Sequence, residues 1–295
     1  MPATGGSAPS HAVQCMEIVG GNAARREHLR GVGLEMWVDS RPLGGGAGGD
    51  IHYFSMCGGG HVTRLVIADV AGHGAVVDDA ARRLRRLMRK YINTLDQTRL
   101  ARTLNDEFGA GTEDGRFATA LLVTYFAPTR HLILCNAGHP RPLWYRRGEG
   151  TWGWLDAESS DAGSLRRSKA RYHLERVRNL PLGILSPTDY EQFAVELGVG
   201  DLVVIYTDAW TEARNPAGAM LGEVGLLDFV RRIDPAGPDE VGSGLTAALD
   251  AWRGGAVPED DQTLVVIEHV GGGVPPLTFG VAVRSLLKML GVLRV

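Results

Sequence analysis

Val66-Ile67-Ala68-Asp69-Val70-Ala71-Gly72-His73-Gly74 ends an apolar run with an aspartate and a glycine-rich turn. Residues 61–68 predict a strand, because they are apolar and rich in β-branched side chains. Residues 75–95 predict a long amphipathic helix, because Leu84, Leu87 and Tyr91 recur at helical spacing. The stretch therefore joins a strand to a helix and leaves a carboxylate at the end of the strand.

The remaining apolar runs predict strands and helices on both sides of this unit. Runs of strands and runs of helices follow one another without strict alternation, so we predict an α+β sandwich rather than a doubly wound sheet. The predicted strands cover residues 34–38, 51–56, 118–126, 131–135, 201–206 and 263–269, and the further helices cover residues 100–108, 221–233 and 238–252.

The ends of the chain and one internal segment lack this regularity. Residues 1–33 are small, polar and Gly/Ala-rich, which predicts a loose lead-in without the apolar core of a signal peptide. A domain over residues 34–270 follows, interrupted by residues 146–179, which show no period and predict a mobile insertion. The tail, residues 271–295, is apolar but charged, so we expect a terminal helix and no transmembrane segment.

Composition excludes several classes of function. The 295 residues are 44% hydrophobic, enough for one large core, and the formal net charge of −3 gives no attraction to nucleic acid. Cys15, Cys57 and Cys135 are an odd set without close spacing, which argues against disulfides and a thiolate zinc site. We therefore expect a cytoplasmic protein with reduced thiols.

Four acidic sites lie at the ends of apolar runs: Asp50, Asp69, Asp208 and the pair Asp260-Asp261. Converging carboxylates repel one another unless cations are bound, and oxygen-only ligands suit Mg²⁺ or Mn²⁺. Two such ions activate a water for attack on a phosphoryl group. The pattern therefore predicts a metal-dependent phosphoester hydrolase.

Seven motifs in order carry a resemblance to a known family: Gly48-Gly49-Asp50, residues 68–74, Phe117-Ala118-Thr119-Ala120, Asn136-Ala137-Gly138-His139-Pro140, Leu180-Pro181-Leu182-Gly183, residues 207–213 and Asp260-Asp261-Gln262-Thr263. The chain resembles the PPM-type metal-dependent serine/threonine phosphatases, in the bacterial branch of sporulation stage II protein E and the sigma-factor regulatory phosphatases. The resemblance implies an α-β-β-α sandwich of two antiparallel sheets flanked by helices. It also implies two Mn²⁺ or Mg²⁺ ions and a phosphorylated protein substrate, such as an anti-sigma factor antagonist.

The resemblance assigns roles to individual residues. Asp69 would bridge both metals and the backbone carbonyl of Val70 would bind the second, with the bridging water as nucleophile. Asp208 and Asp260 would hold the first metal, so that Asp69 and Asp208 carry the catalysis. Asp50 would bind a metal directly or through water, and Asp261 is a further candidate metal ligand.

Several alternatives stay open. Ala209 stands where the family has glycine, which supports a catalytically silent module that sequesters a signalling partner. A hydrolase of small phosphoesters shares the same metal chemistry. His73 and His139 are expected to be structural, and the basic run over residues 82–90 either docks an acidic partner or is solvated. A homodimer would use the tail or the helix over residues 75–95.

Overall fold

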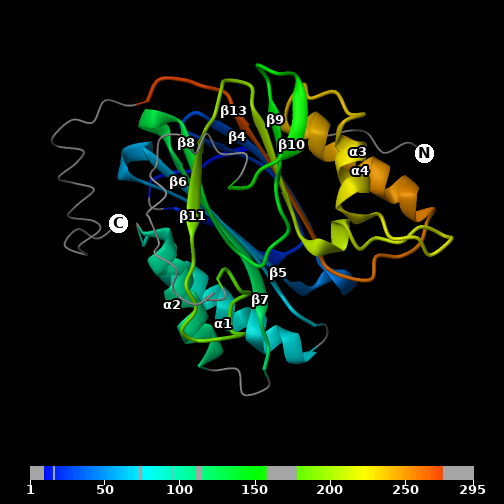
Figure 1. The fold of residues 1–295 in the computed structure, drawn as a ribbon, viewed down its shortest axis with the longest axis horizontal. Coiled ribbons are helices and arrows are strands. Elements are labelled where there is room, and N and C mark those ends of the chain that lie inside the picture. Colours follow the sequence, from blue (N-terminus) through cyan, green and yellow to red (C-terminus); the bar gives the residue numbers. More distant parts are fainter. Residues whose placement is uncertain are drawn as a thin grey trace, which may run out of the picture.

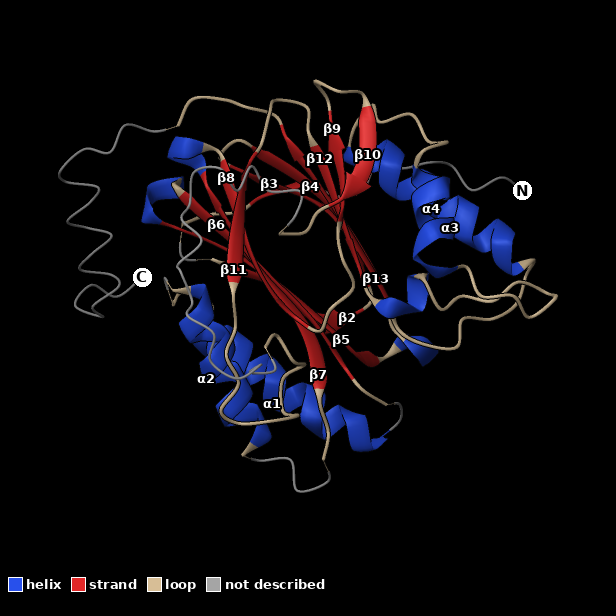
Figure 2. Cartoon of the chain, in the orientation of Figure 1, coloured by secondary structure: helices blue, strands red, loops and turns tan. Residues whose placement is uncertain are grey.

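The computed structural model describes residues 10–15, 17–72, 75–94, 96–110, 115–157 and 178–274. Two sheets lie face to face, with helices on both outer sides (Figures 1 and 2). This arrangement confirms the α-β-β-α sandwich that the resemblance implied. No helix in these ranges is long and apolar enough to cross a membrane.

Sheet A has seven strands, and all neighbours are antiparallel except the first pair, which is parallel. Its order is β1 (Ser10–Ala12), β3 (Arg25–Gly31), β4 (Leu34–Arg41), β13 (Gln262–His269), β12 (Leu202–Tyr206), β9 (Leu143–Arg146) and β10 (Thr151–Trp154).

Sheet B has six strands and is antiparallel throughout. Its order is β11 (Gln192–Glu196), β8 (His131–Ala137), β7 (Ala118–Phe126), β6 (Val62–Val70), β5 (Ala47–Cys57) and β2 (Ile18–Ala23).

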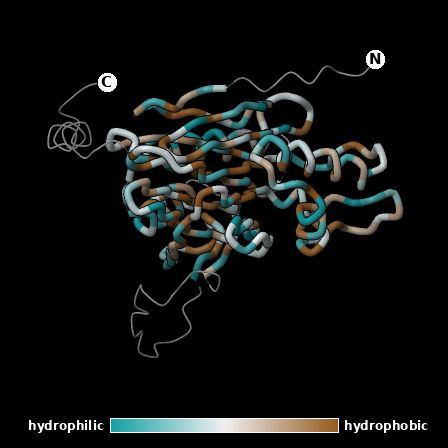
Figure 3. The backbone as a smooth tube through the Cα atoms, turned by 90° about the horizontal axis from the view of Figure 1, so that it is seen from above, coloured by the Kyte–Doolittle hydropathy of each residue, from teal (hydrophilic) through white to brown (hydrophobic). Residues whose placement is uncertain are grey.

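Four α-helices in the described part of the chain cover the outer faces of the sheets. The helices α1 (Ala75–Tyr91) and α2 (Gln97–Gly109) pack on sheet B, whereas α3 (Gly222–Val230) and α4 (Pro238–Arg253) pack on sheet A. Seen from above, the chain forms stacked layers that contain hydrophobic stretches (Figure 3). Three apolar clusters result, because each sheet buries side chains on both faces: one between the sheets and one under each helix pair.

The structure corrects the expected loose lead-in. Residues 10–31 contribute β1, β2 and β3, and β2 and β3 extend both sheets beside β5 and β4. Leu29 is completely buried between the sheets. The segment is ordered by pairing with strands far along the chain, which its small polar composition does not reveal.

The insertion is also partly corrected. Residues 151–154 form β10, which pairs with β9, and Trp152 packs against Tyr145 with the ring centroids 5.2 Å apart. Trp152 is therefore a core residue of sheet A rather than part of a mobile insertion. Residues 158–177 and the predicted tail helix over residues 277–295 lie outside the described residues.

Candidate functional site

Four chain segments bring the predicted acids to one end of the sandwich. In sheet B, Ile51 pairs with Ala68, so the next residues outward on the two strands are Asp50 and Asp69. In sheet A, Tyr206 pairs with Leu264. Asp208 follows β12 in a short 3-10 helix, and the pair Asp260-Asp261 immediately precedes β13. Both sheets therefore contribute carboxylates to the same edge.

These carboxylates share one electrostatic environment. Asp50 is 3% exposed, and its burial raises its pKa to about 8, assisted by the negative charges of Asp261 and Asp208. Burial also raises the pKa of Asp69 well above its ordinary value, and Asp50, Asp208 and Asp260 add to this effect. The site thus gathers acidic groups where water cannot fully screen their charges, so each opposes the ionisation of its neighbours.

Hydroxyl groups of sheet A hold Asp50, which belongs to sheet B. The Thr207 hydroxyl donates to Asp50 Oδ2 at 2.9 Å and accepts the Thr263 N–H at 3.0 Å. The Thr263 side chain also hydrogen bonds Asp50 and lies 3.2 Å from the Ser40 hydroxyl. Asp50 Oδ1 is buried without a hydrogen-bond partner among the described residues. The clamp thus fixes the carboxylate and leaves one oxygen for another ligand.

Sequence reasoning missed this clamp. Thr207, which adjoins Asp208, and Thr263, two residues after Asp261, lie inside two of the quoted motifs, but neither was given a role, and Ser40 was not considered. The sequence feature that could have revealed the clamp is a threonine within two residues of the aspartates at the ends of β12 and β13.

Asp261 is placed differently from the other acids. Its Oδ1 accepts the N–H of Leu43 at 2.6 Å, and its Oδ2 accepts the N–H of Gly49. A Cβ at Gly48 would lie 2.5 Å from Asp261 Oδ2, so only glycine fits there. Both oxygens are thus engaged with the loop that leads into Asp50, which indicates an anchoring role rather than the metal ligation kept open for Asp261.

The carbonyl of Val70 lies beside the same loop. A Cβ at Gly49 would be 3.2 Å from the Val70 oxygen, and Gly72 has a φ of 110°, which favours glycine. Gly49 thus lets the loop come close to this carbonyl. The chain after Gly72 includes His73, which lies outside the described residues.

His139 has the structural role expected of it. Its ring Nδ1 lies 3.0 Å from the Thr119 hydroxyl. The His139 N–H donates to Asn136 Oδ1 at 2.7 Å, and this bond closes the turn. Burial lowers the pKa of His139 to about 3, so the ring is neutral. Gly138 has a φ of 70°, and a Cβ there would overlap Pro181. The motif therefore shapes a turn rather than supplying an acid or base.

Ala209 fits its position without strain. It lies in the 3-10 helix Asp208–Trp210, and within the described ranges only Arg130 and Asn179 have a positive φ among non-glycine residues. The alanine methyl is buried, with 6% of the residue exposed. The replacement of glycine therefore imposes no backbone cost, which removes the structural argument for a silent site.

The donor set fits hard divalent cations. Within the described ranges, no three His, Cys, Asp or Glu side chains already stand at the spacing of a metal cage. Nevertheless, Asp50, Asp69, Asp208 and Asp260 oppose one another's ionisation, and Asp50 keeps one unpartnered oxygen. Cations at this edge would relieve that repulsion and use this oxygen.

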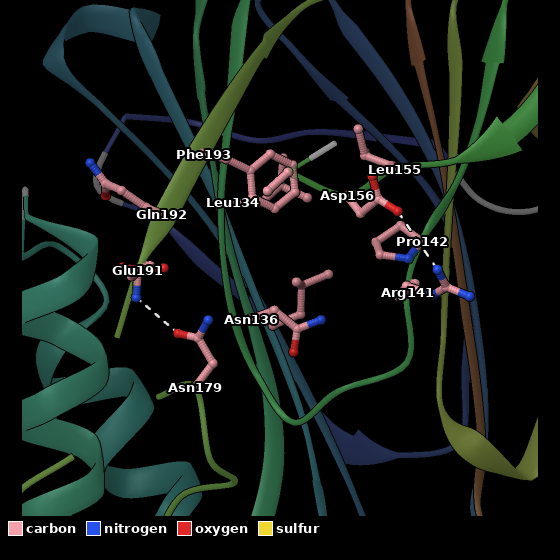
Figure 4. A pocket seen from close by; sticks show the side chains of 12 residues that line it. Leu134, Asn136, Arg141, Pro142, Leu155, Asp156, Asn179, Glu191, Gln192 and Phe193 are labelled. Carbon is pink, nitrogen blue, oxygen red and sulfur yellow. Dashed lines mark hydrogen bonds and ion pairs between the residues drawn. The ribbon is translucent and has the colours of Figure 1, made fainter. Parts of the chain in front are cut away.

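A separate cavity of about 230 Å³ lies between the sheets, away from these acids. Figure 4 shows its polar rim, where the Glu191 N–H donates to Asn179 and Arg141 pairs with Asp156 at 3.6 Å. Its floor is apolar, with Leu134 and Phe193. No motif in the sequence predicted this cavity.

Comparison with known proteins identifies relatives of the chain. Residues 59–270 match the family of stage II sporulation protein E (SpoIIE). The phosphoserine phosphatase RsbU of Bacillus subtilis (strain 168) is 24% identical over 155 residues, which are 52% of this chain and 40% of that protein. The chain thus spans less than half the length of this relative.

Solved structures share the fold. The RsbU and RsbW domains of Rv1364c from Mycobacterium tuberculosis superpose with a TM-score of 0.64 at 21% identity, covering 94% of this chain and 70% of that one. The PP2C phosphatase domain of SpoIIE from Bacillus subtilis, with a fragment of its regulatory domain, gives 0.62 at 18% identity, covering 86% and 71%. At these identities the likeness establishes the fold alone.

Two further structures of this fold contain metal. The catalytic domain of the serine/threonine phosphatase PstP was solved with two manganese ions, and it superposes with a TM-score of 0.51 at 16% identity over 80% of this chain and 97% of that one. RsbX, solved in complex with magnesium, gives 0.53 at 15% identity over 85% and 99%.

Proposed function

Because the chain belongs to the SpoIIE family, we propose that it is a metal-dependent protein phosphatase acting on phosphoserine or phosphothreonine. Its substrate is a bacterial signalling protein such as an anti-sigma factor antagonist. The observation that carries the proposal is the convergence of Asp50, Asp69, Asp208 and Asp260 from both sheets on one edge, where each carboxylate opposes the ionisation of another. The phosphatase RsbU and the metal-containing PstP and RsbX support it.

We assign two Mn²⁺ or Mg²⁺ ions to this edge. Asp69 and the carbonyl of Val70 would hold one ion, Asp69, Asp208 and Asp260 the other, and Asp50 would contribute directly or through water. Bound divalent ions lower the pKa of a coordinated water and stabilise the charge of a phosphoryl group in transfer.

The protein's own residues prepare this edge for cations. Thr207 and Thr263 orient the Asp50 carboxylate, and Asp261 fixes the loop that precedes it. Burial raises the pKa of Asp50 to about 8, so this carboxyl keeps a proton at neutral pH, and burial also raises the pKa of Asp69. Cations that bind here would compete with protons for these oxygens. Asp69 and Asp208 are close enough to hydrogen bond, which supports their assignment to a shared ion.

The central test is Mn²⁺-dependent phosphate release from an aryl phosphate and from a phosphoserine protein. We expect Asp69→Asn and Asp208→Asn to lower the rate on the order of 10²-fold or more, because each removes a charged ligand. Asp228→Asn is the matched control, since Asp228 is half-exposed on α3 and pairs only at the surface with Arg231. Undiminished activity in both ligand variants would overturn the mechanism.

The two alternatives give different results in the same experiments. If the protein is a silent binding module, titration calorimetry should detect no Mn²⁺ binding at this edge. The structural argument for such a module is weak, because Ala209 imposes no backbone strain. A hydrolase of small phosphoesters predicts that the aryl phosphate outcompetes the phosphoprotein, whereas a protein phosphatase predicts a higher kcat/KM for the protein.

A further inference from the structure

A second cavity in the described part of the chain lies beside Asp260. It has a volume of about 580 Å³ and lies between the loop after β12, residues 209–220, and the loop before β13, residues 253–260. Because Ala209 and Asp260 line it, the cavity is continuous with the carboxylate edge. If a phosphorylated residue of the substrate binds at that edge, the substrate residues next to it can therefore reach the cavity.

The loop over residues 209–220 forms one wall of this cavity, and hydrogen bonds fix its conformation. The side chain of Asn215 accepts the N–H groups of Ala217 at 3.0 Å and Ala219 at 2.9 Å, which locks the turn. The Trp252 indole donates to the Ala213 carbonyl at 3.1 Å and ties the loop to α4. The cavity is thus preformed and does not depend on a ligand to order its wall.

The rim of the cavity exposes apolar side chains. Met220 is 47% exposed and Val257 is 78% exposed, and both line the cavity. Leu43, whose N–H binds Asp261 on another side of the carboxylates, is 44% exposed. Large apolar side chains around a charged centre are typical of a surface that contacts another protein.

The charges of the lining disfavour an acidic ligand. Glu212 and Glu259 lie on the rim with Asp260, and both are exposed. These three acids outnumber the two arginines of the lining. Arg214 donates to the Gly218 carbonyl at 2.9 Å and Arg253 donates to Gln262 at 3.0 Å, so both guanidinium groups are held by neutral oxygens. An acidic side chain would meet the carboxylates, whereas an apolar one would cover Met220 and Val257.

We propose that this cavity is a substrate subsite, which takes a large apolar side chain of the substrate protein close to its phosphorylated residue and rejects an acidic one. This inference rests on the proposed function, because the phosphate would lie at the carboxylate edge. It adds a source of specificity that a small phosphoester, bound only at that edge, does not use.

Matched phosphoserine peptides test the subsite. One set carries leucine and the other glutamate, at each flanking position in turn, and kcat/KM is measured with Mn²⁺. We expect leucine to be preferred by about 10–100-fold at one position, the range of hydrophobic pocket discrimination. Val257→Asp and Met220→Ser are expected to lower that preference about tenfold. Val199→Asp is the control, since Val199 is 60% exposed and lies outside the cavity lining.

Two readouts separate this proposal from the proposed function. Phosphate release from an aryl phosphate reports the carboxylate edge alone, and its absence would overturn the proposed function. Binding of fluorescent, non-hydrolysable phosphonate peptides reports the subsite even without turnover. Equal binding of the leucine and glutamate peptides at every position, or a preference that both variants retain, would overturn the subsite. Thermal melts of each variant verify that it is folded.

Discussion

Asp261 holds the loop before Asp50 through two backbone N–H groups, those of Leu43 and Gly49. A carboxylate that accepts two such bonds is fixed in orientation, and the loop is fixed in return. The Asp261 N–H also donates to Asp260 Oδ1 at 2.8 Å. One residue therefore connects two proposed metal ligands that lie on different sheets.

We predict that Asp261→Ala lowers the affinity for Mn²⁺ by about tenfold, because residues that orient metal ligands contribute on this scale. Asp261→Asn is expected to lose less, since its amide oxygen retains one acceptor for the loop. Titration calorimetry measures the affinity, and faster hydrogen exchange of the Gly49 amide reports the loosened loop. Glu149→Gln is a distant control. Unchanged affinity and exchange in Asp261→Ala would contradict the anchoring role.

The sequence predicted which acids gather but not what each one does. Asp50, Asp69, Asp208 and Asp260 were placed together because each ends or precedes an apolar run, and the structure brings them to one edge. Asp261 has the same local pattern as Asp260, so their different partners appear only in three dimensions. The hydroxyl clamp around Asp50 likewise depends on contacts between strands that lie about 160 residues apart.

Among the elements, α4 packs on sheet A more closely than any side chain larger than glycine permits. A Cβ at Gly242 would lie 2.3 Å from Trp37 Cε3, and Gly242 is buried in the second turn of the helix. Glycine is normally unfavourable inside a helix, by roughly 1 kcal/mol relative to alanine. The close contact with Trp37 is the reason for its presence.

We therefore predict that Gly242→Ala destabilises the protein in spite of its better helix propensity. Overpacking against a buried ring costs about 1–3 kcal/mol, which exceeds the propensity gain in most of that range. The free energy of unfolding from urea titration gives the measurement. Ser243→Ala, one residue along and exposed, should change it by no more than about 0.5 kcal/mol. A more stable Gly242→Ala variant would show that α4 shifts freely on the sheet.

Predictability from sequence differed among the elements for a physical reason. The strand β6 was predicted from its continuous apolar run, and the helix α1 from the helical spacing of its buried side chains. In contrast, β2 contains Gly20 and Gly21, β3 buries only Leu29 completely, and β11 was not predicted at all. These strands are stabilised by their neighbours in the sheets, and a local pattern does not record that pairing.

For the molecule as a whole, the carboxylate edge is the place where residues of sheet A contact residues of sheet B. Ser40, Thr207 and Thr263 belong to the segments of sheet A, whereas Asp50 and Asp69 belong to sheet B. Repulsion between buried carboxylates therefore acts against the packing of one sheet on the other. Protons or cations at this edge should stabilise the entire sandwich.

The stability of the metal-free protein should accordingly fall as the pH rises from 6.5 to 8. The folded-state pKa of Asp50 is raised to about 8 by burial, and that of Asp69 is raised well above its ordinary value, so the folded state binds more protons than the unfolded state in this window. For each extra proton that the folded state binds, the free energy of unfolding falls by at most about 1.4 kcal/mol per pH unit as the pH rises. The buried histidines His52 and His139 have lowered pKa values and are neutral in the folded state, so their protonation in the unfolded state opposes this fall near pH 6.5 and this opposition fades towards pH 8.

Urea unfolding in EDTA at several pH values measures this slope, and Asp50→Asn should reduce it because the amide binds no proton. Mn²⁺ should stabilise the protein more at pH 8 than at pH 6.5, since protons compete with the metal less as the pH rises. The Asp228→Asn control should keep the full slope. A metal-free stability that stays constant or increases from pH 6.5 to 8 would show that the carboxylates are ionised without a cation, and that the two sheets pack together without needing one.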